Sequence, residues 1–238
     1  AYKMGNNDVT IGILEKTMKN PIINDENIYI MAADIYREKK ETDKYLAVLQ
    51  AGKKKFPNSK SISNEELNYY ITSGNTSEAV SKLEAAAAAD PSKAELQFNL
   101  GVLYSGLSEK ETDAKKAAEY FEKSSAAYKK SIELDGKNPD YIYNYGVLEY
   151  NKAKKMTDVM NKENDNAKYD VMKKERDVVI NRALPLLEKA LSVIEAAGIS
   201  DSNKGTYSNV LEGLTQAYTV LNMNDKAGAI MEKAKKIK

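Results

Sequence analysis

The sequence predicts an all-α protein built from stacked helical repeats. Tyr36, Tyr70 and Tyr104 follow one another at a step of 34 residues, and Leu49 and Leu83 keep the same step. A fixed period of this size indicates short units that bury their apolar faces by stacking on their neighbours. The 238 residues are 42% hydrophobic and 30% charged, with 12 glycines and 5 prolines, which is typical of a folded helical chain.

The composition excludes several classes of chemistry. The chain has no cysteine and no histidine, so disulfides, thiolate metal sites, cysteine nucleophiles and histidine-based triads are all excluded. Phosphate-binding and dinucleotide-binding glycine motifs are missing from the sequence. The net charge of +1 gives no broad footprint for nucleic acid, and no apolar run approaches the ~18 residues of a membrane span. We therefore expect no enzyme, no catalytic or metal-ligating residues and no cofactor.

The first part of the chain divides at turn and capping signals. Residues 1–25 fit half a repeat, namely its second helix alone, followed by full repeats over 26–59 and 60–93. The pair Ser63 and Glu66 has the spacing of a capping box and predicts a helix start. The missing partner of the first helix suggests that the chain is truncated at its N-terminus.

The next two repeats are lengthened. Residues 94–137 form a repeat whose second helix is predicted to run from Thr112 to Leu134. Residues 138–200 form a repeat with an extended helical hairpin, which we expect to break near Asn164–Asn166. A last repeat spans 201–238, and all repeats are expected to form one continuous domain.

The 34-residue step and the small residues at Gly101 and Gly146 resemble the tetratricopeptide-repeat (TPR) family. The segments Gly74–Pro91 and Ala183–Ala190 are the best matches, whereas the lengthened repeats and the lack of tryptophan depart from the family pattern. The resemblance covers nearly the whole chain. It implies a helical-hairpin solenoid wound into a right-handed superhelix, with a concave groove lined by the first helix of each repeat.

A looser resemblance concerns location. The long hairpin and the run Ala183–Leu191 are similar to a group of exported bacterial TPR proteins. This resemblance implies the cell envelope or periplasm of a bacterium, with a signal peptide removed. A cytoplasmic location is the alternative.

The resemblance also implies which residues face the groove. Ser105 is one such position, and asparagines and aromatic residues at others suit peptide recognition, because amides can hold a peptide backbone and aromatic rings suit anchor pockets. The alternative for the aromatic residues is packing between the two enlarged repeats. The candidate partner-binding residues are Arg37, Asn64, Asn68, Phe98, Tyr143, Tyr150 and Gln216.

Two further features bear on binding. Ile30 and Asp34 stand where some TPR proteins carry a carboxylate clamp, and an acidic Asp34 would repel a carboxylate, so we expect no such clamp. Met156, Met160 and Met172 of the long hairpin could offer an adaptable apolar contact, or could simply pack its two helices together.

Three functions stay open from the sequence. The favoured hypothesis is a non-catalytic scaffold that binds a peptide or protein segment in the concave groove. The second is an architectural protein of the cell envelope that associates with itself as a homo-oligomer. The third is a small-ligand binder with a pocket around Phe98 and Tyr143. We expect no nucleic-acid partner and no transmembrane segment.

Overall fold

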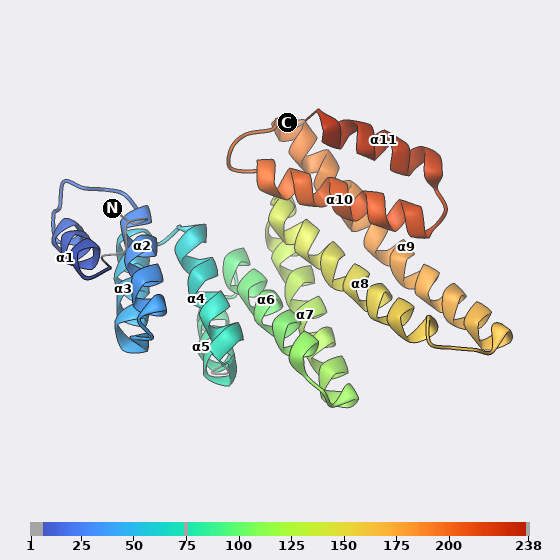
Figure 1. Cartoon of the computed structure of the whole chain (residues 1–238), viewed down its shortest axis with the longest axis horizontal. Helices are drawn as coiled ribbons and strands as arrows, with labels where there is room; N and C mark the ends of the chain where they lie inside the picture. The colour runs from blue at the N-terminus through green and yellow to red at the C-terminus, as the bar shows by residue number, and fades with distance from the viewer. Residues whose placement is uncertain (1–6, 74–75, 237–238) are drawn as a thin grey trace. The chain divides into compact units, whose positions relative to one another are not determined.

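The structure, a computed structural model, describes residues 7–73 and 76–236. It does not describe the side chains of seven residues inside helices: Lys60, Leu67, Asn68, Ile71, Thr72, Ser73 and Glu78. Within these limits all regular secondary structure is α-helical (Figure 1), which confirms the all-α prediction.

The helices follow one another with short connections. In chain order they are α1 Asn7–Met18, α2 Asn27–Glu38, α3 Thr42–Lys55, α4 Lys60–Ser73, α5 Thr76–Ala89, α6 Ala94–Lys110, α7 Ala114–Leu134, α8 Pro139–Met160, α9 Asn166–Ala197, α10 Lys204–Val220 and α11 Asn224–Lys235. The chain forms two compact units, Ala1–Ala79 and Val80–Lys238, and the boundary between them in the sequence falls within α5. The repeat boundaries stay a prediction, and so does their grouping into one continuous domain.

The first unit is built around tyrosines and small residues of α2 and α3. Helix α2 packs against α1 and α3, and α4 packs against both α2 and α3. Ala32 and Ala33 are fully buried, as is Ile62 of α4, and Tyr45 and Leu49 are almost so. Their alternation of small and large side chains fills the spaces between closely spaced helices.

The second unit contains three antiparallel helix pairs, α6 with α7, α8 with α9, and α10 with α11. Its larger core joins the last four helices through residues such as Ile142, Leu187 and Leu214. A smaller core joins α7 and α8 through Tyr128, Tyr145 and Leu148.

Tyrosine hydroxyls connect successive helix pairs inside each unit. In unit 1, Tyr36 of α2 donates a hydrogen bond to Glu15 of α1. In unit 2, Tyr104 of α6 donates to Glu84 of α5, and the Tyr218 hydroxyl of α10 lies 2.6 Å from a Glu188 oxygen of α9. The hydroxyls of Tyr145 and Ser125 are 3.2 Å apart and link α8 to α7. Each contact gives a buried phenol the polar partner that it needs.

Two glycines mark the points where helices come closest. A Cβ at Gly101 of α6 would lie 2.6 Å from ring atoms of Tyr128, and one at Gly146 of α8 would lie 2.9 Å from Leu187 Cδ2. Atoms this close overlap, so only glycine allows these approaches. Both glycines therefore serve close helix packing.

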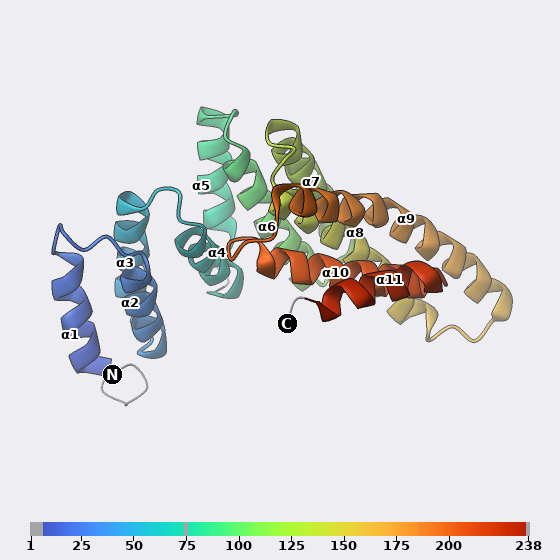
Figure 2. The same ribbon diagram turned by 90° about the horizontal axis from the view of Figure 1, so that it is seen from above.

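The lengthened helices lie where the sequence predicts them. Helix α7 has 21 residues and begins two residues later than predicted, because the Asp113 carboxylate caps it by accepting from Lys116 N. Helices α8 and α9 have 22 and 32 residues and form a hairpin whose turn projects beyond α10 and α11 (Figures 1 and 2). The Asp165 carboxylate accepts from Ala167 N and Lys168 N and so starts α9 directly after the predicted break.

Candidate functional site

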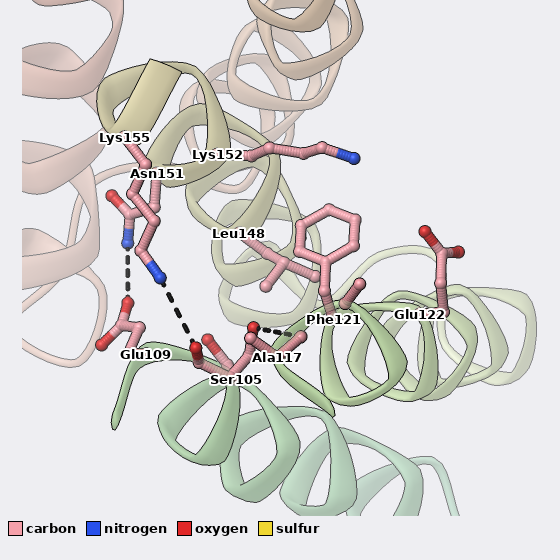
Figure 3. A pocket seen from close by; sticks show the side chains of 11 residues that line it. Ser105, Glu109, Ala117, Phe121, Glu122, Leu148, Asn151, Lys152 and Lys155 are labelled. Atoms are coloured by element: carbon pink, nitrogen blue, oxygen red, sulfur yellow. Dashed lines mark hydrogen bonds between the residues drawn. The ribbon is translucent and has the colours of Figure 1, made fainter. Parts of the chain in front are cut away.

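An apolar pocket lies between three helices of the second unit (Figure 3). Its volume is about 190 Å³. The walls come from the C-terminal part of α6, the first half of α7 and the second half of α8, and Phe121 and Leu148 lie side by side within it (Figure 3). We call this the α6–α8 pocket; its lining residues are Ser105, Ser108, Glu109, Ala117, Ala118, Phe121, Glu122, Leu148, Asn151, Lys152 and Lys155.

Local hydrogen bonds fix the polar side of the α6–α8 pocket. The Ser108 hydroxyl donates to the Ala117 carbonyl at 2.8 Å and so ties α6 to α7. The Asn151 amide donates to Glu109 Oε1 at 3.1 Å and ties α8 to α6. These bonds turn polar groups toward one another and leave carbon atoms of Phe121 and Leu148 in the hollow (Figure 3).

Two lysines of α8 form the rim. Lys152 Nζ lies 4.5 Å from the centre of the Phe121 ring, where the ring's negative face attracts a cation. Lys155 Nζ lies 3.5 Å from the Ser108 carbonyl oxygen, at the limit of a hydrogen bond. Among the described residues, neither ammonium has a carboxylate within ion-pair distance. The rim is therefore positive next to an apolar floor.

A second hollow continues along the same helix. It has a volume of about 300 Å³ between α8 and α9, and we call it the hairpin pocket; its lining residues are Lys152, Lys155, Met156, Val159, Met172 and Glu175. Met160 is buried and packs the two helices together, whereas Met156 and Met172 stay half-buried. The adaptable apolar contact expected of Met156 and Met172 stays a prediction.

The candidate residues of the second unit fall into two neighbourhoods. Phe98 stacks on Tyr141 with ring centres 4.8 Å apart and packs on the smaller core. Tyr143 and Tyr150 are half-buried against the larger core, and burial raises the pKa of each phenol. Gln216 is exposed and donates to Glu212 at 3.1 Å.

Tyr143 also lies near Glu212, whose charge adds to the raised pKa of the phenol. Phe98 packs on the smaller core and Tyr143 on the larger one, and the two cores share the half-buried Ile132 and Leu186. A ligand pocket around Phe98 and Tyr143 stays a hypothesis.

Among the described side chains, the candidate partner-binding residues of the first unit line none of the pockets described above. Asn64 is exposed on α4, and the side chain of Asn68 lies outside the described residues. Arg37 forms ion pairs with Asp34 and Glu65. Because these two carboxylates engage its guanidinium, Arg37 is poorly placed to grip the carboxylate of a partner.

The lysine rim was not predicted from the sequence. Leu148, Lys152, Lys155 and Val159 recur at helical spacing on one face of α8, which was a readable signal. The same pattern is also typical of a solvated helix surface, and the sequence does not show which helix packs beside that face. Ser105 lines the α6–α8 pocket, and its place in the concave groove stays a prediction.

The described ranges offer neither a metal site nor a membrane span. No cluster of three or more acidic side chains there is arranged to hold a metal ion. In the same ranges no helix combines the length and the apolar character that crossing a membrane requires.

Solved structures with similar architecture identify the fold. The thermophilic TPR protein TTC0263 of Thermus thermophilus superimposes with a TM-score of 0.54 at 14% identity, over 88% of this chain and 90% of that one. The chain has a TPR fold. The BtubC protein of P. vanneervenii gives a TM-score of 0.53 at 16% identity, over 98% of this chain and 88% of that one. The TPR solenoid predicted from the 34-residue step is confirmed.

A family model matches part of the chain. Residues 71–163, less than half of the sequence, match the model described as the plant specific mitochondrial import receptor subunit TOM20. No curated protein matches the sequence. The TOM20 match contradicts the prediction of a bacterial cell envelope or periplasm and of an exported protein, since it points to mitochondria instead. The looser resemblance on which that prediction depended was carried by the long hairpin, a feature of shape rather than of location.

Proposed function

We propose that the chain is a non-catalytic scaffold that binds a segment of a partner protein and anchors it in the α6–α8 pocket. TPR folds generally serve protein interaction rather than catalysis, and this supports the assignment. The candidate positions Phe98, Tyr143, Tyr150 and Gln216 of the same unit are proposed to line the rest of this binding surface, and Asn64 and Asn68 of the first unit stay separate candidates.

The observation that carries the proposal is an open apolar hollow of the right size for one side chain. A cavity of about 150 Å³ holds a benzene molecule, so the α6–α8 pocket, at about 190 Å³, has room for a branched aliphatic or aromatic side chain. Burying such a side chain contributes about 1.5–3 kcal/mol. A pocket with an apolar floor and few polar groups is the common form of an anchor site.

The family match adds support from the sequence. The segment that matches the import-receptor model, residues 71–163, contains every residue that lines the α6–α8 pocket. A receptor acts by recognising a protein segment, and a pocket inside the matched segment is suited to that task.

A selection from a displayed library of random peptides tests the proposal. Ala118 is exposed and lines the pocket, so Ala118→Trp places an indole there without entering the core. Ala126 is exposed on the same helix outside the pocket, and Ala126→Trp is the matched control. We expect enriched peptides that bind the unmodified chain and the control but not Ala118→Trp. Peptides that bind all three proteins alike would overturn the pocket as the anchor site.

Self-association is a second candidate, supported by an apolar face on α1. The side chains of Val9 and Ile13 are 57% and 56% exposed, one helical turn apart. Light scattering after size exclusion distinguishes the two functions. A dimer that Ile13→Asp converts to a monomer supports self-association, whereas a monomeric unmodified chain rejects it.

A further inference from the structure

The two pockets of the second unit share a strip of α8. Lys152 and Lys155 line both the α6–α8 pocket and the hairpin pocket. Leu148 lies in the first pocket alone and Val159 in the second alone, and all four residues are on one face of the helix. At 1.5 Å per residue, the strip from Leu148 to Val159 is about 16 Å long, or three turns of a helix.

The strip is apolar at both ends and positively charged in the middle. Each end is apolar, formed by Phe121 and Leu148 at one end and by Met156, Val159 and Met172 at the other. The middle carries the two ammonium groups. Val159 is 59% exposed, so this end is open to a partner.

The acidic residues of the two pockets lie on the helices that flank the strip, α6, α7 and α9. Glu109 and Glu122 line only the α6–α8 pocket, and Glu175 lines only the hairpin pocket. Glu109 already accepts a hydrogen bond from Asn151. Carboxylates of a partner would be attracted to the middle of the strip, where the described residues offer the lysines no ion-pair partner of their own.

We propose that the partner segment is an amphipathic helix of about three turns with a central carboxylate between two apolar anchors. One anchor enters the α6–α8 pocket and the other enters the hairpin pocket. The carboxylate lies between Lys152 and Lys155 and accepts hydrogen bonds from both. This inference rests on the proposed scaffold function and adds the chemical class of the partner.

The lysines suit this task because each is held by a weak contact that a carboxylate can replace. Lys152 lies against the Phe121 ring, and Lys155 reaches a backbone carbonyl at 3.5 Å. A charge-assisted hydrogen bond in a partly desolvated site is stronger than either contact. The lysines therefore add a preference for a carboxylate at the middle of the strip, while the two apolar anchors fix the register.

A series of synthetic peptides tests the inference. Three labelled peptides of about four helical turns carry the same leucine anchors and differ only in a central pair of glutamates, glutamines or lysines. Fluorescence anisotropy measures their affinity for the full chain. We expect the glutamate peptide to bind about tenfold more tightly than the glutamine peptide, and the lysine peptide to bind most weakly.

Charge reversal supplies the matched comparison. Lys152→Glu with Lys155→Glu should invert the order, so that the lysine peptide binds best. Lys154→Glu with Lys174→Glu changes the net charge equally at exposed positions outside both pockets, and should leave the order unchanged. Lys152→Gln with Lys155→Gln, with helicity checked by circular dichroism, should remove the preference if the reversed variant fails to fold.

The outcomes separate the inference from the proposed function. Equal binding of all three peptides, abolished by Ala118→Trp, overturns the central carboxylate and keeps the scaffold. A preference of the unmodified chain for the lysine peptide overturns the inference in favour of a basic segment. No binding of any peptide overturns the inference, and the scaffold proposal falls with it only if the library selection also yields no peptide that depends on the pocket.

Discussion

At the scale of single residues, the close approach of α6 and α7 depends on the missing side chain of Gly101. An alanine there would place its Cβ 2.6 Å from the buried ring of Tyr128. We predict that Gly101→Ala lowers the free energy of unfolding by about 1–3 kcal/mol, because overpacking outweighs the better helix propensity of alanine. Urea denaturation followed by circular dichroism measures the change.

The control for Gly101→Ala is a glycine with room around it. A Cβ at Gly228 in α11 would have no atom within 4 Å, so Gly228→Ala should raise the free energy of unfolding by about 0.5–1 kcal/mol. If Gly101→Ala proved equally stabilising, the helices would be farther apart than described.

Recurring residues were the part of the molecule that the sequence could predict. Tyr36 and Tyr104 were placed correctly because the 34-residue step shows which side chains must fill equivalent spaces between helices. Their partners Glu15 and Glu84 were not predictable, because a glutamate on a helix surface has the same pattern whether or not a hydroxyl reaches it. Lys152 and Lys155 were missed for the same reason.

At the scale of helices, a buried carboxylate ties α9 to α8. The Glu149 side chain of α8 is 8% exposed, and its Oε2 lies 3.4 Å from Arg182 Nε of α9. Within the described residues Glu149 Oε2 has no hydrogen-bond partner, so the charge of Arg182 is its main compensation. Such a pair stabilises less than apolar packing would, but losing one partner is costly.

We predict that Arg182→Leu lowers the free energy of unfolding by about 1–3 kcal/mol, because it leaves the Glu149 carboxylate buried without a cation. The double variant Glu149→Leu with Arg182→Leu should recover most of the loss. Chemical denaturation of both variants checks this. If the double variant were less stable than Arg182→Leu, the ion pair itself would stabilise the hairpin. The loss in Arg182→Leu would then not come from leaving the Glu149 carboxylate buried without a cation.

In the long hairpin, the sequence predicted the helix break but not the hollow between the helices. Its break was predicted from Asn164–Asn166, and the structure starts α9 there because Asp165 can cap it. The hollow between Met156 and Met172 was not predictable as a site, since its shape depends on how far apart α8 and α9 lie. Periodicity predicts which face is apolar, and packing decides which part of it stays open.

At the scale of the whole molecule, tyrosine hydroxyls connect the stacked helices in both units, and their protonation contributes to stability. Burial, together with the hydrogen bond to Glu15, raises the pKa of Tyr36 to about 12. Burial also raises the pKa of Tyr141 to about 12, and the pKa values of Tyr104 and Tyr218 in the same direction. An unfolded chain loses these protons near pH 10.

The folded chain therefore keeps its phenol protons to a higher pH than the unfolded chain. The stability that these groups contribute is complete below about pH 10 and is lost as the pH rises through about 12. We predict that the advantage of the unmodified chain over Tyr36→Phe shrinks across this window. Denaturation at several pH values, with tyrosinate absorbance followed in parallel, measures it; a constant difference would contradict the raised pKa of Tyr36.

The proposed function depends on a pocket that no single repeat contains. Its walls come from both helices of one pair and the first helix of the next, and the fold alone does not specify what it binds. The pocket lies inside the segment, residues 71–163, that matches the family model.

Isothermal titration of the tightest library-selected peptide against three proteins tests the scaffold proposal most directly. The unmodified chain and Ala126→Trp should bind it with equal affinity. Ala118→Trp should weaken binding by about tenfold to a hundredfold, the loss expected when one apolar anchor of about 1.5–3 kcal/mol is excluded. Unchanged affinity in Ala118→Trp would contradict the account, because the peptide would then bind outside the α6–α8 pocket.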